Sequence, residues 1–126
     1  MTADLAEAVR GREVILLVTP SQRMREQARL LAPLLWPGAI VVSCSKGLEL
    51  GSHLRMTQML TQELPATARI CALSGPNLAR EVAQGLPTGS VVASADPVAA
   101  DRVRLALSTP TFRVYTSDDV VGVELG

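Results

Sequence analysis

The sequence predicts an α/β fold in which one mostly parallel sheet is flanked by helices. Five short segments of strand length alternate with segments whose apolar residues recur at helical spacing. The first of them, residues 13–18, is a continuous apolar run, which is typical of strands buried on both faces of a parallel sheet. Short junctions containing Pro, Gly or Ser separate the segments, and no linker sets off a second domain. Alternation of this kind indicates one layered domain with right-handed crossovers.

The N-terminal part is expected to form a short helix and the first strand. Residues 3–9 follow Thr2, a residue type that caps helices. Residues 13–18 are a continuous apolar run of strand length, and the Thr-Pro-Ser sequence at residues 19–21 ends it. We therefore expect the first loop at the edge of the sheet to contain Pro20.

A helix and the second strand come next. Four apolar residues recur at the spacing of one helical face, with charged residues between them: Met24, Ala28, Leu31 and Leu35. Pro33 and the Pro-Gly pair at residues 37–38 end this helix. Residues 39–43 are the second expected strand, and they lead into a polar loop that contains Lys46.

The third strand lies between two further helices. Residues 55–64 have a helical pattern that stops at Pro65, and residues 69–74 are an apolar strand. Asn77 is expected to cap a helix that ends near Gly85, because Asn is a favoured cap and Gly a favoured stop.

The last third of the chain adds two strands and two helices. Residues 90–94 and 112–116 are the expected strands. Asp96, followed by a proline, begins the helix between them, which extends to about residue 107. The Ser-Asp-Asp sequence at residues 117–119 caps a final helix. The shorter connections in this part leave an antiparallel pairing of the last strands open.

Composition excludes several classes of protein. The chain has 126 residues, of which 48% are hydrophobic and 2% aromatic, so we expect one domain with an aliphatic core. Basic and acidic residues balance at 12 each, and no basic stripe indicates a nucleic-acid partner. No apolar run is long enough to span a bilayer, and residues 1–10 do not have the pattern of a signal peptide. We therefore expect a cytoplasmic protein without a membrane partner.

Cysteine and histidine give no sign of a metal site. Cys44 and Cys71 lie in apolar segments far apart in the sequence, and reduced, buried thiols are a simpler interpretation than a disulfide or a metal pair. His53 is the only histidine and has no partner at ligand spacing. We expect no metal and no nucleophilic triad.

The strongest candidate for chemistry is Lys46. Of the 12 basic residues it is the only lysine. It follows a strand whose carboxyl end is the place where open α/β sheets bind ligands. Its compact charge suits a phosphate or a polarised oxygen, and Gly47 allows the backbone to approach a ligand closely. The alternative is a solvated lysine in a turn.

A second candidate is the junction that contains Gly75 and Asn77. The free amides of a helix N-terminus favour an anion or a polar oxygen. The alternatives are structural, with Asn77 as a helix cap and Gly75 as a turn residue. Pro20 and the acids at residues 118–119 also follow strands, but a strand–helix junction and helix capping explain them. We expect Pro20, Lys46 and Gly75 to share one edge of the sheet.

Five strings in this order resemble the bacterial NAD(P)-dependent sn-glycerol-3-phosphate dehydrogenase family: VTPSQ, CSKGLELG, ALSGPNLAREVAQGLPT, VVAS and FRVYTSDDVVGVELG. The SKGLE and SGPNLA strings together carry most of the specificity. The resemblance implies a Rossmann-type N-terminal domain and a helical C-terminal substrate domain. It also implies the reversible reduction of dihydroxyacetone phosphate to sn-glycerol 3-phosphate with NAD(P)H, for phospholipid synthesis.

The resemblance implies roles for four residues. Lys46 matches a family lysine that contacts both the substrate and the cofactor, NAD or NADP. Gly75 and Asn77 match substrate-contact positions, and Ala79 matches a cofactor-contact position. Asn77 departs from the Ser or Thr of many members, although all three residue types can cap a helix and donate a hydrogen bond.

Other features of the family are expected outside the chain. The glycine-rich turn would precede Met1, the proton-transferring lysine would follow Gly126, and the helical substrate domain has no counterpart here. We therefore interpret residues 1–126 as a partial cofactor-binding domain that is inactive alone, with no catalytic residue of its own. A non-catalytic interaction or regulatory module and another β-hydroxyacid-type dehydrogenase are the alternatives. The choice between NAD and NADP, and a homo-oligomer of the full-length form, stay open.

Overall fold

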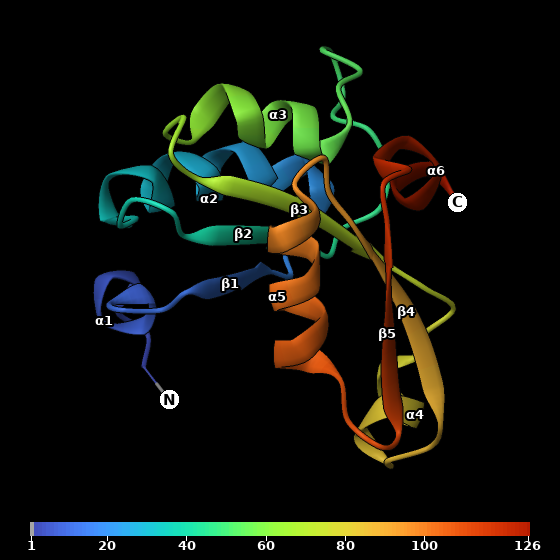
Figure 1. The fold of residues 1–126 in the computed structure, drawn as a ribbon. Helices are drawn as coiled ribbons and strands as arrows, with labels where there is room; N and C mark the ends of the chain where they lie inside the picture. Colours follow the sequence, from blue (N-terminus) through green and yellow to red (C-terminus); the bar gives the residue numbers. More distant parts are fainter. Residues whose placement is uncertain (1) are drawn as a thin grey trace.

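The computed structural model describes residues 2–126 and contains one five-stranded sheet (Figure 1). The strands lie in chain order: β1 (Val14–Leu17), β2 (Ile40–Ser43), β3 (Arg69–Ser74), β4 (Thr88–Ala93) and β5 (Phe112–Ser117). The helices are α1 (Leu5–Val9), α2 (Met24–Leu31), α3 (Met56–Glu63), α4 (Ala79–Ala83), α5 (Pro97–Leu107) and α6 (Val120–Leu125). Two 3₁₀ turns, η1 (Ser21–Arg23) and η2 (Ala32–Leu34), flank α2.

The sheet changes direction once, between β3 and β4. Strands β1, β2 and β3 are mutually parallel, β4 is antiparallel to β3, and β5 is parallel to β4. A parallel neighbour needs a crossover helix that packs on the sheet. The only helix between β3 and β4 is α4, which has five residues and buries none of them. The chain therefore returns directly, and the mostly parallel α/β sheet is confirmed with one antiparallel pairing.

Helices cover both faces of the sheet, and each face has its own aliphatic core. Helices α2 and α3 pack on one face through residues that include Met24, Leu31, Met59 and Leu60. Helix α5 packs on the opposite face against β2, β3, β4 and β5. All four residues of β2 are buried, which explains why this strand has a continuous apolar sequence. Figure 1 shows α2 and α3 on one side of the strands and α5 on the other.

The predicted cap of α5 agrees with the structure, but the predicted cap of α1 does not. The prediction for Asp96 is confirmed, because its carboxylate accepts hydrogen bonds from the amides of Val98 and Ala99 at the start of α5. The prediction that Thr2 caps the first helix is wrong. Asp4 is the N-cap of α1 and accepts from the amide of Glu7 at 3.2 Å.

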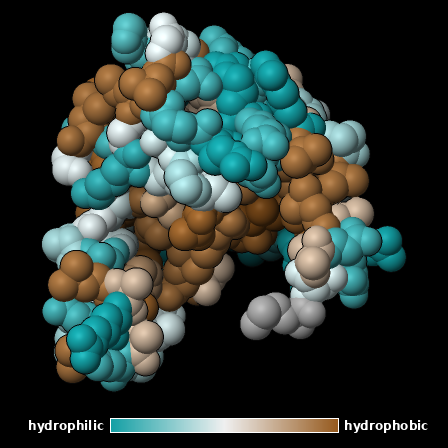
Figure 2. Space-filling model, turned by 180° about the vertical axis from the view of Figure 1, so that it is seen from behind, coloured by the Kyte–Doolittle hydropathy of each residue, from teal (hydrophilic) through white to brown (hydrophobic). Residues whose placement is uncertain are grey.

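Strand β1 forms one edge of the sheet and leaves apolar side chains exposed. Leu16 is 41% exposed and Val18, directly after the strand, is 74% exposed. Figure 2 shows the molecule from behind, with apolar side chains gathered in the hollowed middle of that face. No helix in residues 2–126 is long and apolar enough to cross a membrane.

Candidate functional site at the carboxyl ends of the parallel strands

The loops after β1, β2 and β3 meet at one edge of the sheet because these strands are parallel. Pro20 follows β1, Lys46 follows β2 and Gly75 follows β3. The hydroxyl of Ser45 donates a hydrogen bond to the carbonyl of Thr19, which joins the first two loops. The prediction that Pro20, Lys46 and Gly75 share an edge is therefore confirmed.

A cavity of about 370 Å³ joins the second loop to the third. Lys46 lies on one side, Ser74 to Pro76 lie at the end of β3, and α6 contributes Gly122 and Val123. The volume falls within the range of small-molecule sites, roughly 300–1,000 Å³. This edge thus combines a cavity of adequate size with the only lysine of the chain.

Lys46 points toward the end of α6. Its Nζ donates a hydrogen bond to the carbonyl oxygen of Gly126 at 2.9 Å, across 80 residues of sequence. A cation is favourable beside the carboxyl end of a helix, where the free carbonyl groups carry partial negative charge. An ammonium group has three N–H donors, so two stay available for oxygens of a ligand.

Gly75 is required by a close approach between backbones. A Cβ atom at this position would lie 2.6 Å from the carbonyl oxygen of Gly89 and 3.0 Å from Cα of Ser90, both on β4. Real side chains do not come that close to backbone atoms, so only glycine fits without a shift of the strand. Gly75 therefore lets β3 and β4 pair closely while its backbone lines the cavity.

The prediction that Asn77 caps the following helix is wrong. The N-cap of α4 is Leu78, and no side chain accepts a hydrogen bond from the first turn. Asn77 instead donates from Nδ2 to the hydroxyl of Ser90 and accepts at Oδ1 from the hydroxyl of Thr88 at 2.5 Å. The two hydroxyl groups on β4 satisfy both the N–H and the oxygen of the Asn77 side chain, whereas a helix cap would use only its oxygen. Asn77 does not line the Lys46 cavity.

Ala79 is the first residue of α4 and is exposed. It does not line the cavity that contains Lys46 and Gly75. The structure thus brings Lys46 and Gly75 together at one cavity, whereas Asn77 and Ala79 do not line it. The contacts of all four residues with substrate or cofactor stay predictions.

A cluster of ionic side chains beside the Lys46 loop was not found from the sequence. Arg25, on α2, binds Glu49 of the loop through Nε at 2.6 Å and Nη2 at 2.7 Å. Arg25 also pairs with Glu63, which binds Arg29 at 2.8 Å. The hydrogen bond from Arg25 lowers the pKa of Glu49 to about 2, and Arg29 and then Arg25 lower the pKa of Glu63. No sequence signal marks these pairs, because Arg25 and Glu49 lie 24 residues apart.

Glu124 is a second residue that sequence reasoning missed. Its side chain lies in the short α6, is 7% exposed, and accepts hydrogen bonds from the amide and hydroxyl of Thr57, each at 2.7 Å. Arg55 also pairs with this carboxylate. The N-cap residue of α3 is Arg55, whose side chain only donates and so offers no acceptor to the amides of the first turn. Glu124 supplies the missing acceptor and anchors α6 to α3.

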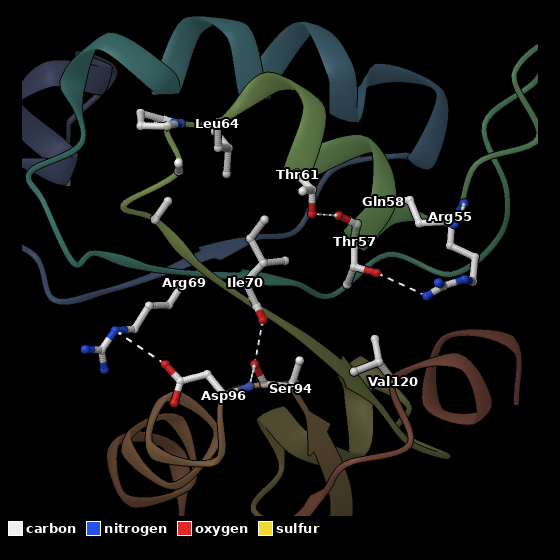
Figure 3. Close-up of a pocket in the computed structure, with 14 residues that line it drawn as sticks. Arg55, Thr57, Gln58, Thr61, Leu64, Arg69, Ile70, Ser94, Asp96 and Val120 are labelled. Atoms are coloured by element: carbon white, nitrogen blue, oxygen red, sulfur yellow. Dashed lines mark hydrogen bonds and ion pairs between the residues drawn. The ribbon is translucent and has the colours of Figure 1, made fainter.

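A larger cavity, of about 510 Å³, lies beside α3 and is lined in part by Val120 of α6 (Figure 3). It extends along α3 and the first half of β3 to the loop after β4. Arg69 and Asp96 form an ion pair of 3.5 Å at one side of it, and the hydroxyl of Ser94 donates to the carbonyl of Ile70 at 2.7 Å. None of the four predicted site residues lines this cavity.

Cys44, Cys71 and His53 do not line the Lys46 cavity. No group of three or more His, Cys, Asp or Glu residues there is arranged to hold a metal ion. Cys44 and Cys71 are free, as the sequence predicts, and burial raises the pKa of each thiol to about 11. His53 lies in the loop between β2 and α3 and has a φ of 58°.

Comparison with known proteins identifies the family to which this sequence is similar. The family model described as NAD-dependent glycerol-3-phosphate dehydrogenase N-terminus matches residues 1–100. The chain is 51% identical over 127 residues to a glycerol-3-phosphate dehydrogenase (NAD(P)+) of Geobacter metallireducens, covering 99% of the chain and 38% of that protein. It is 52% identical over 126 residues to that of Rhodospirillum rubrum, covering 99% of the chain and 36% of that protein. The chain therefore spans less than two-fifths of the length of these relatives.

Solved structures agree with the fold. A glycerol-3-phosphate dehydrogenase from Coxiella burnetii superposes with a TM-score of 0.89 at 33% identity, covering 98% of this chain and 37% of that one. The glycerol-3-phosphate dehydrogenase from Saccharomyces cerevisiae gives a TM-score of 0.83 at 26% identity, covering 98% and 38%. The similarity extends over nearly the whole of the present chain in both cases.

Proposed function

Because the chain belongs to the NAD-dependent glycerol-3-phosphate dehydrogenase family, matching its N-terminal part, we propose that it supplies part of the ligand site of such an enzyme. The proposed reaction is the reversible reduction of dihydroxyacetone phosphate to sn-glycerol 3-phosphate with NADH or NADPH. The observation that carries the proposal is Lys46 on a cavity at the carboxyl ends of parallel strands. We also propose that residues 1–126 are part of the cofactor domain and that the helical substrate domain lies outside them.

The residues of this edge suit part of a dinucleotide and its substrate. Open α/β sheets bind nucleotides at the carboxyl ends of their strands. Gly47, with a φ of 101°, and Gly75 leave backbone accessible in the loops after β2 and β3. The nine glycines of the chain never fall in the G-x-G pattern that seats a pyrophosphate. The chain thus offers one side of a site, and the pyrophosphate contacts are not assigned to its residues.

In this proposal Lys46 orients the substrate. The bound NAD(P)H supplies the hydride that reaches the carbonyl carbon of dihydroxyacetone phosphate. The Lys46 ammonium donates charge-assisted hydrogen bonds to oxygen atoms of the substrate and the cofactor, each contributing on the order of 1.5–3 kcal/mol. Gly75 contributes backbone to the same cavity, and the side chain of Asn77 keeps one N–H for a ligand, since only one is used on Ser90. Ala79 contacts the cofactor from the start of α4.

The isolated chain is expected to show no turnover. Reduction of a carbonyl needs a positioned acid for the oxygen as well as a hydride for the carbon. The only lysine is assigned to binding, and the only histidine, His53, lies in the loop after β2 away from the cavity lining. An assay of NADH oxidation with dihydroxyacetone phosphate should therefore equal the blank without protein. Turnover by the purified chain would contradict this assignment.

A hybrid enzyme tests the proposal. Residues 1–126 replace the matching segment of the Geobacter metallireducens enzyme, and kcat and KM are measured with dihydroxyacetone phosphate and NADH or NADPH. We expect Lys46→Met to lower kcat/KM by roughly 10- to 100-fold, the equivalent of one charged hydrogen bond. Arg104→Met, at an exposed pair on α5, is the control and should leave the parameters unchanged. An active hybrid that is insensitive to Lys46→Met would refute the proposed role.

A further inference from the structure

The loop that carries Lys46 has little regular structure of its own. Residues 44–55 connect β2 to α3, and their only ladder contact is an isolated bridge between Leu48 and Arg55. Cys44 and Leu54 pack against the cores at the two ends of the loop, but Leu48 and Leu50 are 41% and 78% exposed, so burial of apolar side chains does not hold its middle. Lys46 itself is exposed. A defined position for Lys46 must therefore come from polar contacts with neighbouring elements.

Gln22, in η1, binds the loop backbone with both ends of its amide. Its Nε2 donates to the carbonyl of Leu48 at 2.9 Å, and its Oε1 accepts from the amide of Leu50 at 2.9 Å. A side-chain amide used in this way imitates a neighbouring strand and satisfies two backbone groups at once. This contact fixes the loop just after Lys46.

Arg25 binds Glu49, the residue between Leu48 and Leu50. Its guanidinium makes two parallel hydrogen bonds to the carboxylate of Glu49, a geometry that restricts direction as well as distance. The side chains of Arg25 and Glu49 are only 22% and 15% exposed, so water competes with the pair less than at the open surface. Ser52 also donates to Glu49 from within the loop.

The contacts lie on both sides of Lys46. Ser45 is bound to Thr19 before it, while Leu48, Glu49 and Leu50 are bound after it. Gln22 and Arg25 are three residues apart and present their side chains to the same loop. Lys46, the residue of the loop that lines the cavity, is thus held between two anchored segments.

We propose that Gln22 and Arg25 are positioning residues that fix the loop of residues 44–52 and thereby hold Lys46 at its cavity. The consequence for catalysis rests on the proposed function, whereas the positioning of Lys46 does not. Neither residue lines the cavity, so both act through the loop.

The only lysine offers a direct probe of this proposal. Reductive methylation with ¹³C-formaldehyde labels Nζ of Lys46 and the amino terminus and no other site in the chain. A dimethylated ammonium keeps its charge and one N–H, so it can still donate to the carbonyl of Gly126. In the unchanged chain we expect a Lys46 methyl resonance displaced from the free-lysine position and broadened by its fixed environment.

The variants Gln22→Ala and Arg25→Met should move that resonance to the free-lysine position and sharpen it. Arg29→Met is the matched control, because Arg29 binds Glu63 in the same cluster but makes no contact with the loop. It should leave the resonance in place. Urea unfolding of each variant separates a loss of stability from a loss of positioning. Gln22→Ala breaks no ion pair and keeps the test available if Arg25→Met does not fold.

An unchanged Lys46 resonance in a folded Gln22→Ala or Arg25→Met chain would overturn the proposal. A variant that is less stable but has an unchanged resonance would do so as well, because the ion pairs would then be structural only. In the hybrid enzyme, Gln22→Ala should lower kcat/KM on the order of 10- to 100-fold, as misplaced groups do. A resonance that shifts while kcat/KM stays constant would support the positioning and count against the proposed function of Lys46.

Discussion

The carboxylate of Glu124 accepts hydrogen bonds from both the backbone amide and the hydroxyl of Thr57, each at 2.7 Å, and so joins α6 to the first turn of α3. Glu124 is 67 residues from Thr57 and almost fully buried. Because α6 forms one wall of the Lys46 cavity, this contact also sets the shape of the candidate site.

Removing the carboxylate of Glu124 should destabilise the chain strongly. Glu124→Ala leaves the half-buried Arg55 without its carboxylate and the amide of Thr57 without an acceptor, and breaking a buried pair costs about 3–5 kcal/mol. Urea unfolding monitored by circular dichroism measures the change. Glu26→Ala removes the exposed pair with Arg23 and should cost less than about 1 kcal/mol. Equal effects of the two substitutions would show that Glu124 is not an anchor.

Gly75→Ala should disturb the sheet, whereas Gly89→Ala should not. A methyl group on Gly75 would lie 2.6 Å from the carbonyl of Gly89, but one on Gly89 would be 3.7 Å or more from its neighbours. Overpacking of this kind costs typically about 1–3 kcal/mol. The free energy of unfolding of the two variants gives the comparison. If Gly75→Ala were as stable as Gly89→Ala, the close approach of β3 and β4 would not be the reason for this glycine.

Acid should weaken the contact between α2 and the Lys46 loop. Arg25 lowers the pKa of Glu49 from 4.5 to about 2, so the stabilisation is complete above pH 4.5 and is lost as the pH falls from 4.5 toward 2. The slope of unfolding free energy between pH 5 and 2.5 should therefore be smaller in Glu49→Gln than in the unchanged chain. Glu26→Gln, at an exposed pair, is the control. An identical slope in Glu49→Gln would contradict this assignment.

The contribution of Asp96 to stability as the cap of α5 should be separable from the contribution of its charge. Asp96→Ala removes the acceptor for two amides of the first turn and should cost about 1 kcal/mol. Asp96→Asn keeps a favoured cap and loses only the charge, including the pair with Arg69. The melting temperature of Asp96→Asn should therefore be much closer to that of the unchanged chain than the melting temperature of Asp96→Ala. The reverse order would indicate that the ion pair outweighs the cap.

Both thiols should react slowly in the folded chain. Burial raises the pKa of Cys44 and of Cys71 to about 11, and the thiolate is the reactive form. With Ellman's reagent at pH 8, we expect slow release of colour from native protein and rapid release of two equivalents in urea. Rapid reaction of both thiols without denaturant would show that they are exposed.

The sequence by itself determined the features that depend on neighbouring residues. The apolar run of residues 39–43 predicted β2, because a strand buried on both faces has no polar side to alternate with. The order of Asp96 and Pro97 predicted the start of α5, because a cap binds amides only two or three residues away. The position of Lys46 after a strand placed it at the edge that contains the carboxyl ends of β1, β2 and β3, since parallel strands end together.

Only the tertiary structure decided the features that join distant segments. The pattern of an apolar strand does not show whether the strand is parallel or antiparallel to its neighbour. The antiparallel pairing of β4 with β3 follows from α4, which is too short to pack on the sheet as a crossover. Asn77 matched a local cap, but hydroxyl groups on β4 offered its amide two partners. The hydrogen bond that Glu124 accepts from Thr57 spans 67 residues, and no local pattern reports it. Such contacts form only because the sheet brings these side chains together, where burial strengthens a hydrogen bond that water would otherwise replace.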